Sequence, residues 1–262
     1  MEESHEYMKM LRIDRHGDIY RKVIIMRVAV LCDGGGLARL GLEQAGHDCT
    51  GFEISELKHR LSIHVGSGNC IHADVREVDL SSFDAIWASP PCQERSVANT
   101  QHTISSKYAD PSLLSWSLAL PHDILWVENV PVSAQKDTWG KHWNAAQFLE
   151  HPRQNRVRIV GGRYKLPEVY WAYKRFYKGL SHAIIAHEYG GAKMNFTASQ
   201  AFGRDLSIAE CGYYQGLDII PEAWYHVPEH ITGLKWRINI FEALGNGVPV
   251  YMAYAFGKAY KP

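Results

Sequence analysis

The chain has 262 residues, of which 46% are hydrophobic and 21% charged, and its 28 basic residues balance its 28 acidic ones. This composition is typical of an ordinary globular protein with one α/β core and a smaller appendage. It excludes a membrane protein, because no stretch has the roughly 18 uncharged apolar residues that a membrane span requires. The charged first residues lack the apolar centre of a secretory signal, so we expect a cytosolic protein without membrane contact.

The cysteines and histidines favour neither a disulfide framework nor a metal site. The five cysteines are widely spaced and include no C-x-x-C pair, which is typical of reduced thiols. His226 and His230 are four residues apart, but Pro228 between them prevents a shared helical face. We therefore expect no metal ligands in this chain.

The first predicted elements are a strand, a glycine turn and a helix. Residues 1–22 are polar and aperiodic, and we interpret them as an extension outside the core. Residues 23–31 are a continuous apolar run, typical of a strand buried on both faces of a parallel sheet. Residues 32–36 contain three glycines that allow the backbone to approach a ligand closely, and residues 37–45 form a helix. This is the opening unit of a doubly wound fold.

Polar side chains follow at the ends of the next strands. These strands are predicted over residues 49–52, 71–75, 83–88 and 124–127, with a helix over residues 56–65. Glu53 ends the first of them, Asp74 lies in the second, and Cys92 and Glu128 follow the third and the fourth. Because open α/β sheets bind ligands at the carboxyl ends of their strands, we expect these side chains to share one site.

Cys92 lies on a turn that Pro90 and Pro91 stiffen directly after an apolar strand. The two prolines fix successive φ angles and leave the loop little entropy to lose when a substrate binds. This position favours a catalytic thiol. The segment alone fits an inert, half-buried cysteine in an ordinary turn equally well.

The C-terminal half contains a basic region. A sixth strand is predicted over residues 156–160, ended by Gly161-Gly162. Residues 151–204 contain ten Lys or Arg and two acidic residues, and aromatic residues interleave with these charges over residues 170–178. The pattern indicates contact with a polyanion through phosphates and stacked bases, or else a solvated face with a few core aromatics.

Three helices complete the chain. The first is predicted over residues 207–215, where Ser207 and Glu210 have the spacing of a capping box. The other two are predicted over residues 238–244 and 250–259. The turn between them, residues 245–249, fits a ligand-facing loop and a structural turn equally well.

Taken in order, these segments resemble the DNA cytosine-5 methyltransferase family from about Arg27 to Ala255. The resemblance rests on the glycine turn of residues 32–36, Pro90-Pro91-Cys92-Gln93, Glu128-Asn129-Val130, Gln154-x-Arg156-x-Arg158, Arg204-x-Leu206-Ser207 with Glu210 and Gln215-Gly216, and Gly245-Asn246-x-Val248-Pro249. Each motif is weak to moderate alone, whereas their shared order is specific.

The resemblance implies an α/β, Rossmann-like S-adenosylmethionine-dependent methyltransferase fold, with a mostly parallel doubly wound sheet and a small basic target-recognition lobe. The catalytic domain would span residues 23–162 and the lobe residues 163–235. Residues 236–262 would be C-terminal helices that return to the catalytic domain.

The resemblance also implies the reaction and its residues. The chain would transfer a methyl group from S-adenosylmethionine to C5 of a cytosine flipped out of double-stranded DNA, leaving S-adenosylhomocysteine. Cys92 would add to C6 of the ring, Glu128 would protonate N3, and Arg158 would hold O2, while Arg156 would support the loop or a phosphate. The implied cofactor-binding residues are Leu31, Cys32, Asp33, Gly34, Gly35, Gly36, Glu53, Ile54, Asp74, Val75, Pro91, Asn246 and Val248. The implied substrate-binding residues are Gln93, Ser96, Asn129, Gln154, Lys174, Arg175 and Arg204.

The chain departs from the family at several positions. Asp33 stands where the family has the first glycine of its cofactor loop, and Leu31 stands where it has an aromatic residue. Arg95 likewise replaces an aromatic beyond the cysteine motif. Only about 40 residues separate Gly162 from Arg204, so few base contacts are available. We therefore expect a short or degenerate target site, or an accessory protein that supplies specificity.

Four other interpretations remain open. An RNA cytosine-5 methyltransferase of the same fold would suit the short aromatic and basic region, with RNA or single-stranded DNA as the substrate. Ser89-Pro90-Pro91 also resembles the loop of enzymes that methylate exocyclic amino groups, although those have an aromatic residue where this chain has Cys92. A catalytically silent nucleic-acid-binding relative and a nicotinamide-dependent dehydrogenase are the remaining alternatives.

Overall fold

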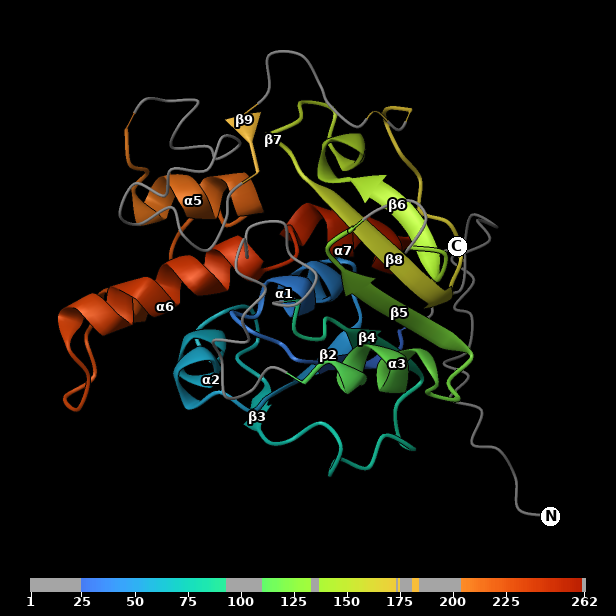
Figure 1. Ribbon diagram of the computed structural model, residues 1–262, viewed down its shortest axis with the longest axis horizontal. Helices are drawn as coiled ribbons and strands as arrows, with labels where there is room; N and C mark the ends of the chain where they lie inside the picture. Colours follow the sequence, from blue (N-terminus) through green and yellow to red (C-terminus); the bar gives the residue numbers. More distant parts are fainter. Residues whose placement is uncertain are drawn as a thin grey trace, which may run out of the picture.

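A seven-stranded sheet forms the centre of the molecule, in the order β3-β2-β1-β4-β5-β8-β6 (Figure 1). The computed structural model describes residues 25–92, 110–132, 137–172, 174, 181–183 and 204–260. The strands of the sheet are β1 (Arg27–Leu31), β2 (Asp48–Glu53), β3 (Cys70–His72), β4 (Ala85–Ala88), β5 (Ile124–Asn129), β6 (Gly140–Asn144) and β8 (Val157–Arg163). β1 to β5 are parallel, whereas β8 is antiparallel to both of its neighbours, β5 and β6.

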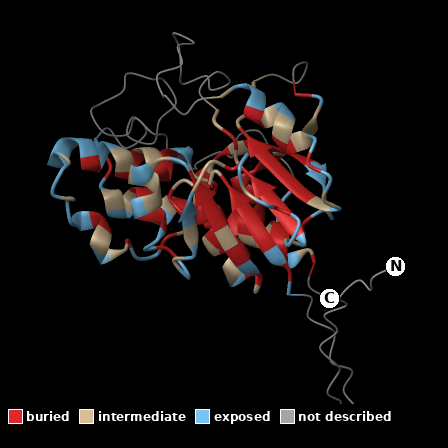
Figure 2. Cartoon of the chain, turned by 90° about the horizontal axis from the view of Figure 1, so that it is seen from below, coloured by how far each residue is buried: buried red, intermediate tan, exposed pale blue. Residues whose placement is uncertain are grey.

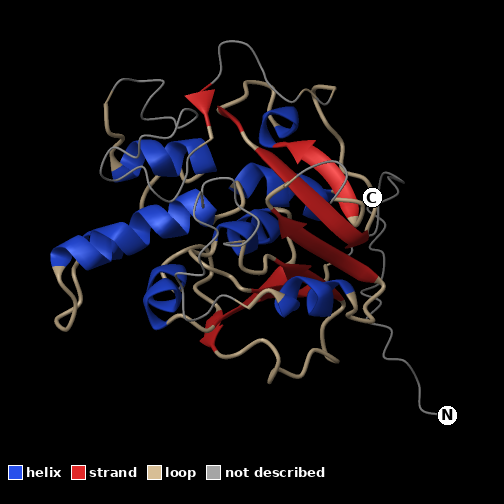
Figure 3. Cartoon of the chain, in the orientation of Figure 1, coloured by secondary structure: helices blue, strands red, loops and turns tan. Residues whose placement is uncertain are grey.

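Helices flank both faces of this sheet (Figure 3). They are α1 (Leu37–Gln44), α2 (Glu56–Ser62), α3 (Ser112–Leu118), α5 (Ile208–Gln215), α6 (Gly233–Asn246) and α7 (Val250–Lys258), with short 3₁₀ turns η1 (Ala145–Phe148) and η2 (Glu222–Tyr225). A separate pair of two-residue strands, β7 (Gln154–Asn155) and β9 (Ser181–His182), is parallel. Within the described residues, no helix is both long and apolar enough to cross a membrane.

The side chains of β1 divide the core into two layers. Val28 and Val30 belong to the core that α1 and α7 cover, whereas Ala29 and Leu31 belong to a second core with Leu113 of α3. Successive side chains of a strand point to opposite faces, so a strand covered on both faces is apolar throughout. Figure 2 shows the resulting band of buried strands.

A third core joins α2, α5 and α6 beside the sheet. Its centre is Trp224 of η2, which is fully buried and donates its indole N–H to the carbonyl of Leu61, 2.9 Å away. Trp236 of α6 donates in turn to the carbonyl of Trp224 at 2.8 Å. These bonds satisfy the N–H groups of both buried indoles. Through η2 they also connect α6 to α2.

The predicted doubly wound α/β fold is confirmed. The short strands β7 and β9 and the 3₁₀ turns η1 and η2 were not predicted. α3 and β6 were not predicted either. β6 contains Lys141 and His142 because it is an edge strand, paired on one side only. Gly161 and Gly162 do not end the sixth strand but lie inside β8, where Gly162 has a φ of 103°.

The second correction concerns the last turn of the chain. α6 starts at Gly233, with Thr232 as its N-cap, and continues through Asn246, so the turn is shorter than predicted. Gly245 is tolerated inside the helix because the packing of α6 against the sheet outweighs the weak helix propensity of glycine. The expected extension over residues 1–22 and most of the expected recognition lobe lie outside the described residues.

Candidate active site

A cavity of about 280 Å³ lies at the carboxyl edge of the parallel strands. It is lined by the segments that follow β1, β2, β3, β4 and β5, by the start of β8 and by the C-terminal half of α6. In open α/β sheets this edge is the usual place for a ligand, because the loops there converge around the point where the strand order reverses. In this sheet the reversal falls between β1 and β4, which are neighbours at its centre.

The cavity brings together most of the residues that the sequence singled out. The lining includes three of the four predicted catalytic residues, namely Cys92, Glu128 and Arg158. It also includes the predicted cofactor residues Cys32, Asp33, Gly34, Glu53, Ile54, Asp74, Val75, Pro91, Asn246 and Val248, together with Asn129. Leu31, Gly35, Gly36, Arg156, Gln154, Lys174 and Arg204 do not line it. Gln93, Arg95, Ser96 and Arg175 lie outside the described residues.

Glu53 connects the end of β2 to the glycine turn. One carboxylate oxygen accepts a hydrogen bond from the backbone N–H of Gly34 at 2.8 Å, and the other accepts from that of Ser55 at 2.8 Å. Gly34 and Gly36 have φ angles of 61° and 80°, in the left-handed region that glycine adopts without strain. A carboxylate has about four acceptor positions, so Glu53 can still accept hydrogen bonds from two hydroxyl groups.

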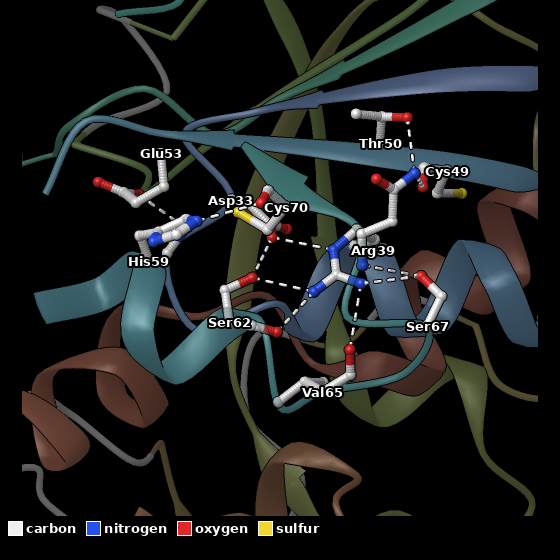
Figure 4. Close-up of polar contacts among 12 residues, drawn as sticks. Asp33, Arg39, Cys49, Thr50, Glu53, His59, Ser62, Val65, Ser67 and Cys70 are labelled. Carbon is white, nitrogen blue, oxygen red and sulfur yellow. Dashed lines mark hydrogen bonds and ion pairs between the residues drawn. The ribbon is translucent and has the colours of Figure 1, made fainter. Parts of the chain in front are cut away.

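Asp33 of the glycine turn directs its carboxylate inward (Figure 4). Its Oδ2 lies 3.0 Å from Nε of Arg39, and both side chains are fully buried. The same oxygen accepts from the hydroxyl of Ser62. Gly51 of β2 provides the room, because a Cβ there would lie 2.7 Å from Cγ of Asp33. Oδ2 of Asp33 is therefore held by Arg39 and Ser62.

Arg39 connects the glycine turn to the segment that follows α2. Besides Asp33, its guanidinium donates to Glu43 at 3.0 Å, to the carbonyl of Val65 at 3.1 Å and to the carbonyl of Ser62 at 2.8 Å. A buried arginine costs desolvation free energy that only such a complete set of acceptors offsets. This network of hydrogen bonds holds the glycine turn in place through Asp33.

The turn that carries Cys92 is held from β5. Asn129 donates its side-chain N–H to the carbonyl of Pro90, 3.0 Å away, and its side-chain oxygen accepts from the backbone N–H of Val130 at 2.9 Å. In β4 the indole of Trp87 donates to Ser89 at 3.0 Å. Cys92 is half-buried and its thiol is free. The prolines and Asn129 together give this turn a fixed backbone beside the cavity.

Glu128 and Arg158 form a buried ion pair in the same cavity. Nε of Arg158 lies 2.7 Å from Oε1 of Glu128, and the two side chains are 8% and 5% exposed. Burial raises the pKa of Glu128 above its usual value, and the positive charge of Arg158 opposes this rise. Burial likewise raises the pKa of the Cys92 thiol, and Arg158 again has the opposing effect. Arg158 is therefore the main cation acting on both groups.

The remaining predicted residues have supporting positions. Arg156, which precedes β8, is buried and donates to the carbonyls of Gly245 and Gly247 at 2.6 and 3.0 Å, and this ties the start of β8 to the end of α6. Gln154 is also buried and donates to the carbonyl of Tyr214 at 2.7 Å. Both therefore hold the C-terminal helices to the sheet. Arg204 is exposed and lies 2.5 Å from Glu210.

Four charged residues of the cavity were missed by the sequence analysis, namely Lys58 of α2, Arg76, Asp110 and Glu242 of α6. A charged position on an amphipathic helix indicates a solvated face when only the sequence is known. Nothing in the spacing of Lys58 or Glu242 distinguishes them from solvent-facing residues. Only the packing of α2 and α6 beside the glycine turn brings them into the cavity.

Solved structures share this architecture. The chain matches the Entamoeba histolytica methyltransferase EhMeth with a TM-score of 0.56 and 11% identity, over 90% of this chain and 98% of that one. It matches a DNA modification methyltransferase described as encoded within an Escherichia coli prophage with a TM-score of 0.52 and 15% identity, over 89% and 98%. It matches the S. pombe Dnmt2 methyltransferase with a TM-score of 0.51 and 14% identity, over 88% and 97%.

Comparison by sequence finds no counterpart. No protein-family model matches the chain, and no curated protein matches it either. At 11 to 15% identity the structural matches establish the fold alone. The sheet order, the antiparallel β8 and these matches together give the chain the Rossmann-like methyltransferase fold.

Proposed function

We propose that the chain is an S-adenosylmethionine-dependent methyltransferase that acts on C5 of a cytosine in DNA through a covalent bond to Cys92. The observation that carries the proposal is that Cys92, Glu128 and Arg158 line the same cavity as Glu53 and the glycine turn. The cavity therefore contains both the proposed nucleophile, the thiol of Cys92, and an acid suited to a nucleoside, Glu53.

The cavity fits the cofactor by the chemistry of its donors and acceptors. Glu53 has two acceptor positions left for the two ribose hydroxyls, and Asp74 lies in the neighbouring part of the lining. Ile54 and Val75 offer apolar surface to an adenine. The sulfonium of S-adenosylmethionine is a cation, and acidic side chains in the lining favour it. When bound, S-adenosylmethionine supplies an electrophilic methyl group.

The residues of the chain would do the rest of the chemistry. The sulfur of Cys92 forms a bond to C6 of the cytosine, and the negative charge that moves into the ring is neutralised when Glu128 donates its proton to N3. Burial raises the pKa of Glu128, which favours its protonated form. After C5 has gained its methyl group, loss of the C5 proton to a base expels the sulfur of Cys92 as a thiolate. The N3 proton returns to Glu128, which restores the neutral ring.

Arg158 has two functions in this proposal. Its charge lowers the pKa of Cys92 against the effect of burial, and thereby increases the thiolate fraction. Its guanidinium also offers further donors to the cytosine O2 while Nε remains on Glu128. Because the reacting atoms of a cytosine are closed inside a base stack, the base must be flipped out to reach the cavity.

A DNA duplex containing 5-fluorocytosine tests the proposal, since fluorine at C5 cannot leave as a proton and the adduct persists. With S-adenosylmethionine present, the wild-type chain should form a protein–DNA adduct that survives denaturing electrophoresis. Cys92→Ala should form none, whereas Cys211→Ala, which alters a buried cysteine outside the cavity, should behave as wild type. Absence of an adduct in the wild type would overturn the proposal.

The same assay decides between polymers. A duplex, a single-stranded DNA and an RNA of one sequence should rank with the duplex first if the substrate is double-stranded DNA. An adduct with RNA alone would instead favour the RNA methyltransferase, and methylation of an exocyclic amino group without any adduct would favour the amino methyltransferase. Bisulfite sequencing of DNA from cells that express the chain then gives the target sequence and shows whether an accessory protein is needed.

A further inference from the structure

Glu242 of α6 is a carboxylate in the cavity to which the proposed reaction gives no part. It lines the cavity next to Ala243 and Asn246 and is half-buried. No hydrogen bond or ion pair joins its carboxylate to any residue that the structure describes. Lys58 lines the same cavity, yet within the described chain it forms no ion pair with Glu242.

The other acids of the lining have partners. Glu53 accepts from two backbone N–H groups, and Glu128 is paired with Arg158. Asp33 is paired with Arg39, and Asp110 with Arg76 at 2.6 Å. Removing a carboxylate from bulk water without a compensating hydrogen bond or cation is unfavourable. A half-buried and unpaired carboxylate in a ligand cavity therefore indicates a cationic group on the ligand.

α6 places Glu242 at the glycine-turn end of the cavity. The helix packs against that turn, because a Cβ on Gly35 would lie 2.9 Å from Cβ of Ala243. Directly after the helix, Gly247 packs on the start of α1, because a Cβ there would lie 2.5 Å from Leu37. Glu242 immediately precedes Ala243. Glu53 and Asp74 follow β2 and β3, and Glu53 approaches the same turn from the β2 side through its bond with the N–H of Gly34.

We propose that Glu242 binds the α-ammonium group of the methionine part of S-adenosylmethionine. The inference rests on the proposed cofactor. With the ribose at Glu53 and the sulfur toward Cys92, the amino-acid tail occupies the end of the cavity between the glycine turn and α6. The tail contains one ammonium group, and Glu242 is the unpaired acid of the described lining at that end.

Binding of two ligands that differ only in the amino group tests this assignment. The probes are S-adenosylhomocysteine and its deaminated analogue, which has hydrogen in place of the amino group, measured by titration calorimetry. The wild type should bind S-adenosylhomocysteine at least tenfold more tightly than the analogue. In Glu242→Gln the affinity for S-adenosylhomocysteine should fall about tenfold, while the analogue binds as before, so the preference disappears. Such a loss corresponds to one charge-assisted hydrogen bond.

Glu229→Gln is the matched control, because Glu229 is an exposed acid that precedes α6 and lies outside the cavity. It should retain the wild-type preference. An unchanged preference for S-adenosylhomocysteine in Glu242→Gln would show that another group binds the ammonium. An equal loss of affinity for both ligands would show that Glu242 only supports the fold. Either result overturns the assignment while leaving the cofactor in place. If the wild type binds neither ligand, the proposed cofactor itself is wrong.

Discussion

Arg158 reaches Glu128 diagonally across the junction of β5 and β8, with Nε and Oε1 2.7 Å apart. Val160 lies directly opposite Glu128 in the sheet, and Arg158 precedes it by two residues on the same face of β8. Diagonal neighbours in antiparallel strands are within reach of long side chains. Because β8 is antiparallel, its first residues lie at the carboxyl edge of β5, and this orientation brings an arginine into the cavity.

Arg158→Lys should reduce the rate of adduct formation with 5-fluorocytosine DNA by about tenfold or more. Lysine keeps the charge but loses the planar fork that can bind Glu128 and a second acceptor at once. The measurement is a single-turnover time course with saturating DNA. Arg153→Lys is the control, since Arg153 pairs with Asp218 at 3.3 Å outside the cavity. Equal rates for both variants and the wild type would exclude this role of Arg158.

Alkylation of Cys92 by iodoacetamide should have a pH midpoint above that of an ordinary cysteine, about 8.5. Only the thiolate reacts, and burial favours the neutral thiol, so the folded pKa is raised and the reactive form increases only at higher pH. Arg158→Met removes the opposing positive charge and should move the midpoint further upward. Peptide mass spectrometry resolves Cys92 from Cys32, and denatured protein should return to the ordinary midpoint. A folded midpoint below that of the denatured chain would contradict the assignment.

Arg39→Met should reduce the free energy of unfolding by about 3 to 5 kcal/mol, because it leaves the fully buried Asp33 without its cation. Asp33→Gly combined with Arg39→Met should recover much of this loss, since no buried charge then remains unpaired. Urea denaturation measures both. Arg60→Met removes an exposed ion pair with Glu56 and should leave stability unchanged within error. If the double variant is no more stable than Arg39→Met alone, the unpaired charge of Asp33 is not the cause of the lost stability.

The sequence was sufficient to predict residues whose position follows from strand ends alone. Glu53, Cys92 and Glu128 each come directly at or after an apolar strand, and parallel strands bring their carboxyl ends to one edge. Arg158 was selected by motif, but its place in the cavity depends on the antiparallel direction of β8, which its sequence does not encode. Short strands of either direction have the same alternation of side chains.

The inward orientation of the Asp33 side chain and the position of Glu242 in the cavity could not be predicted from strand ends. Asp33 turns inward because Arg39 supplies a buried cation and Gly51 leaves space, and both depend on contacts between separate elements. Glu242 enters the cavity only because Ala243 packs on Gly35. Tertiary packing of this kind leaves no periodic signal in a single sequence.

Gly51→Ala tests whether the inward position of Asp33 supports the glycine turn. A Cβ at residue 51 would lie 2.7 Å from Cγ of Asp33 and 3.1 Å from Nε of Arg39, so the fully buried pair must shift. Overpacking of this kind costs about 1 to 3 kcal/mol, and the displaced turn should also bind S-adenosylhomocysteine more weakly.

Asp33→Gly in the Gly51→Ala background should restore both stability and binding relative to Gly51→Ala alone, since it removes the side chain that the new methyl group meets. Gly233→Ala is the control, because a Cβ there has its nearest neighbour at 3.9 Å and should change stability by less than about 0.5 kcal/mol. Denaturation and calorimetry on the four proteins separate the two effects. If Gly51→Ala weakens folding while S-adenosylhomocysteine binds with unchanged affinity, the Asp33–Arg39 pair stabilises the sheet without shaping the turn above it.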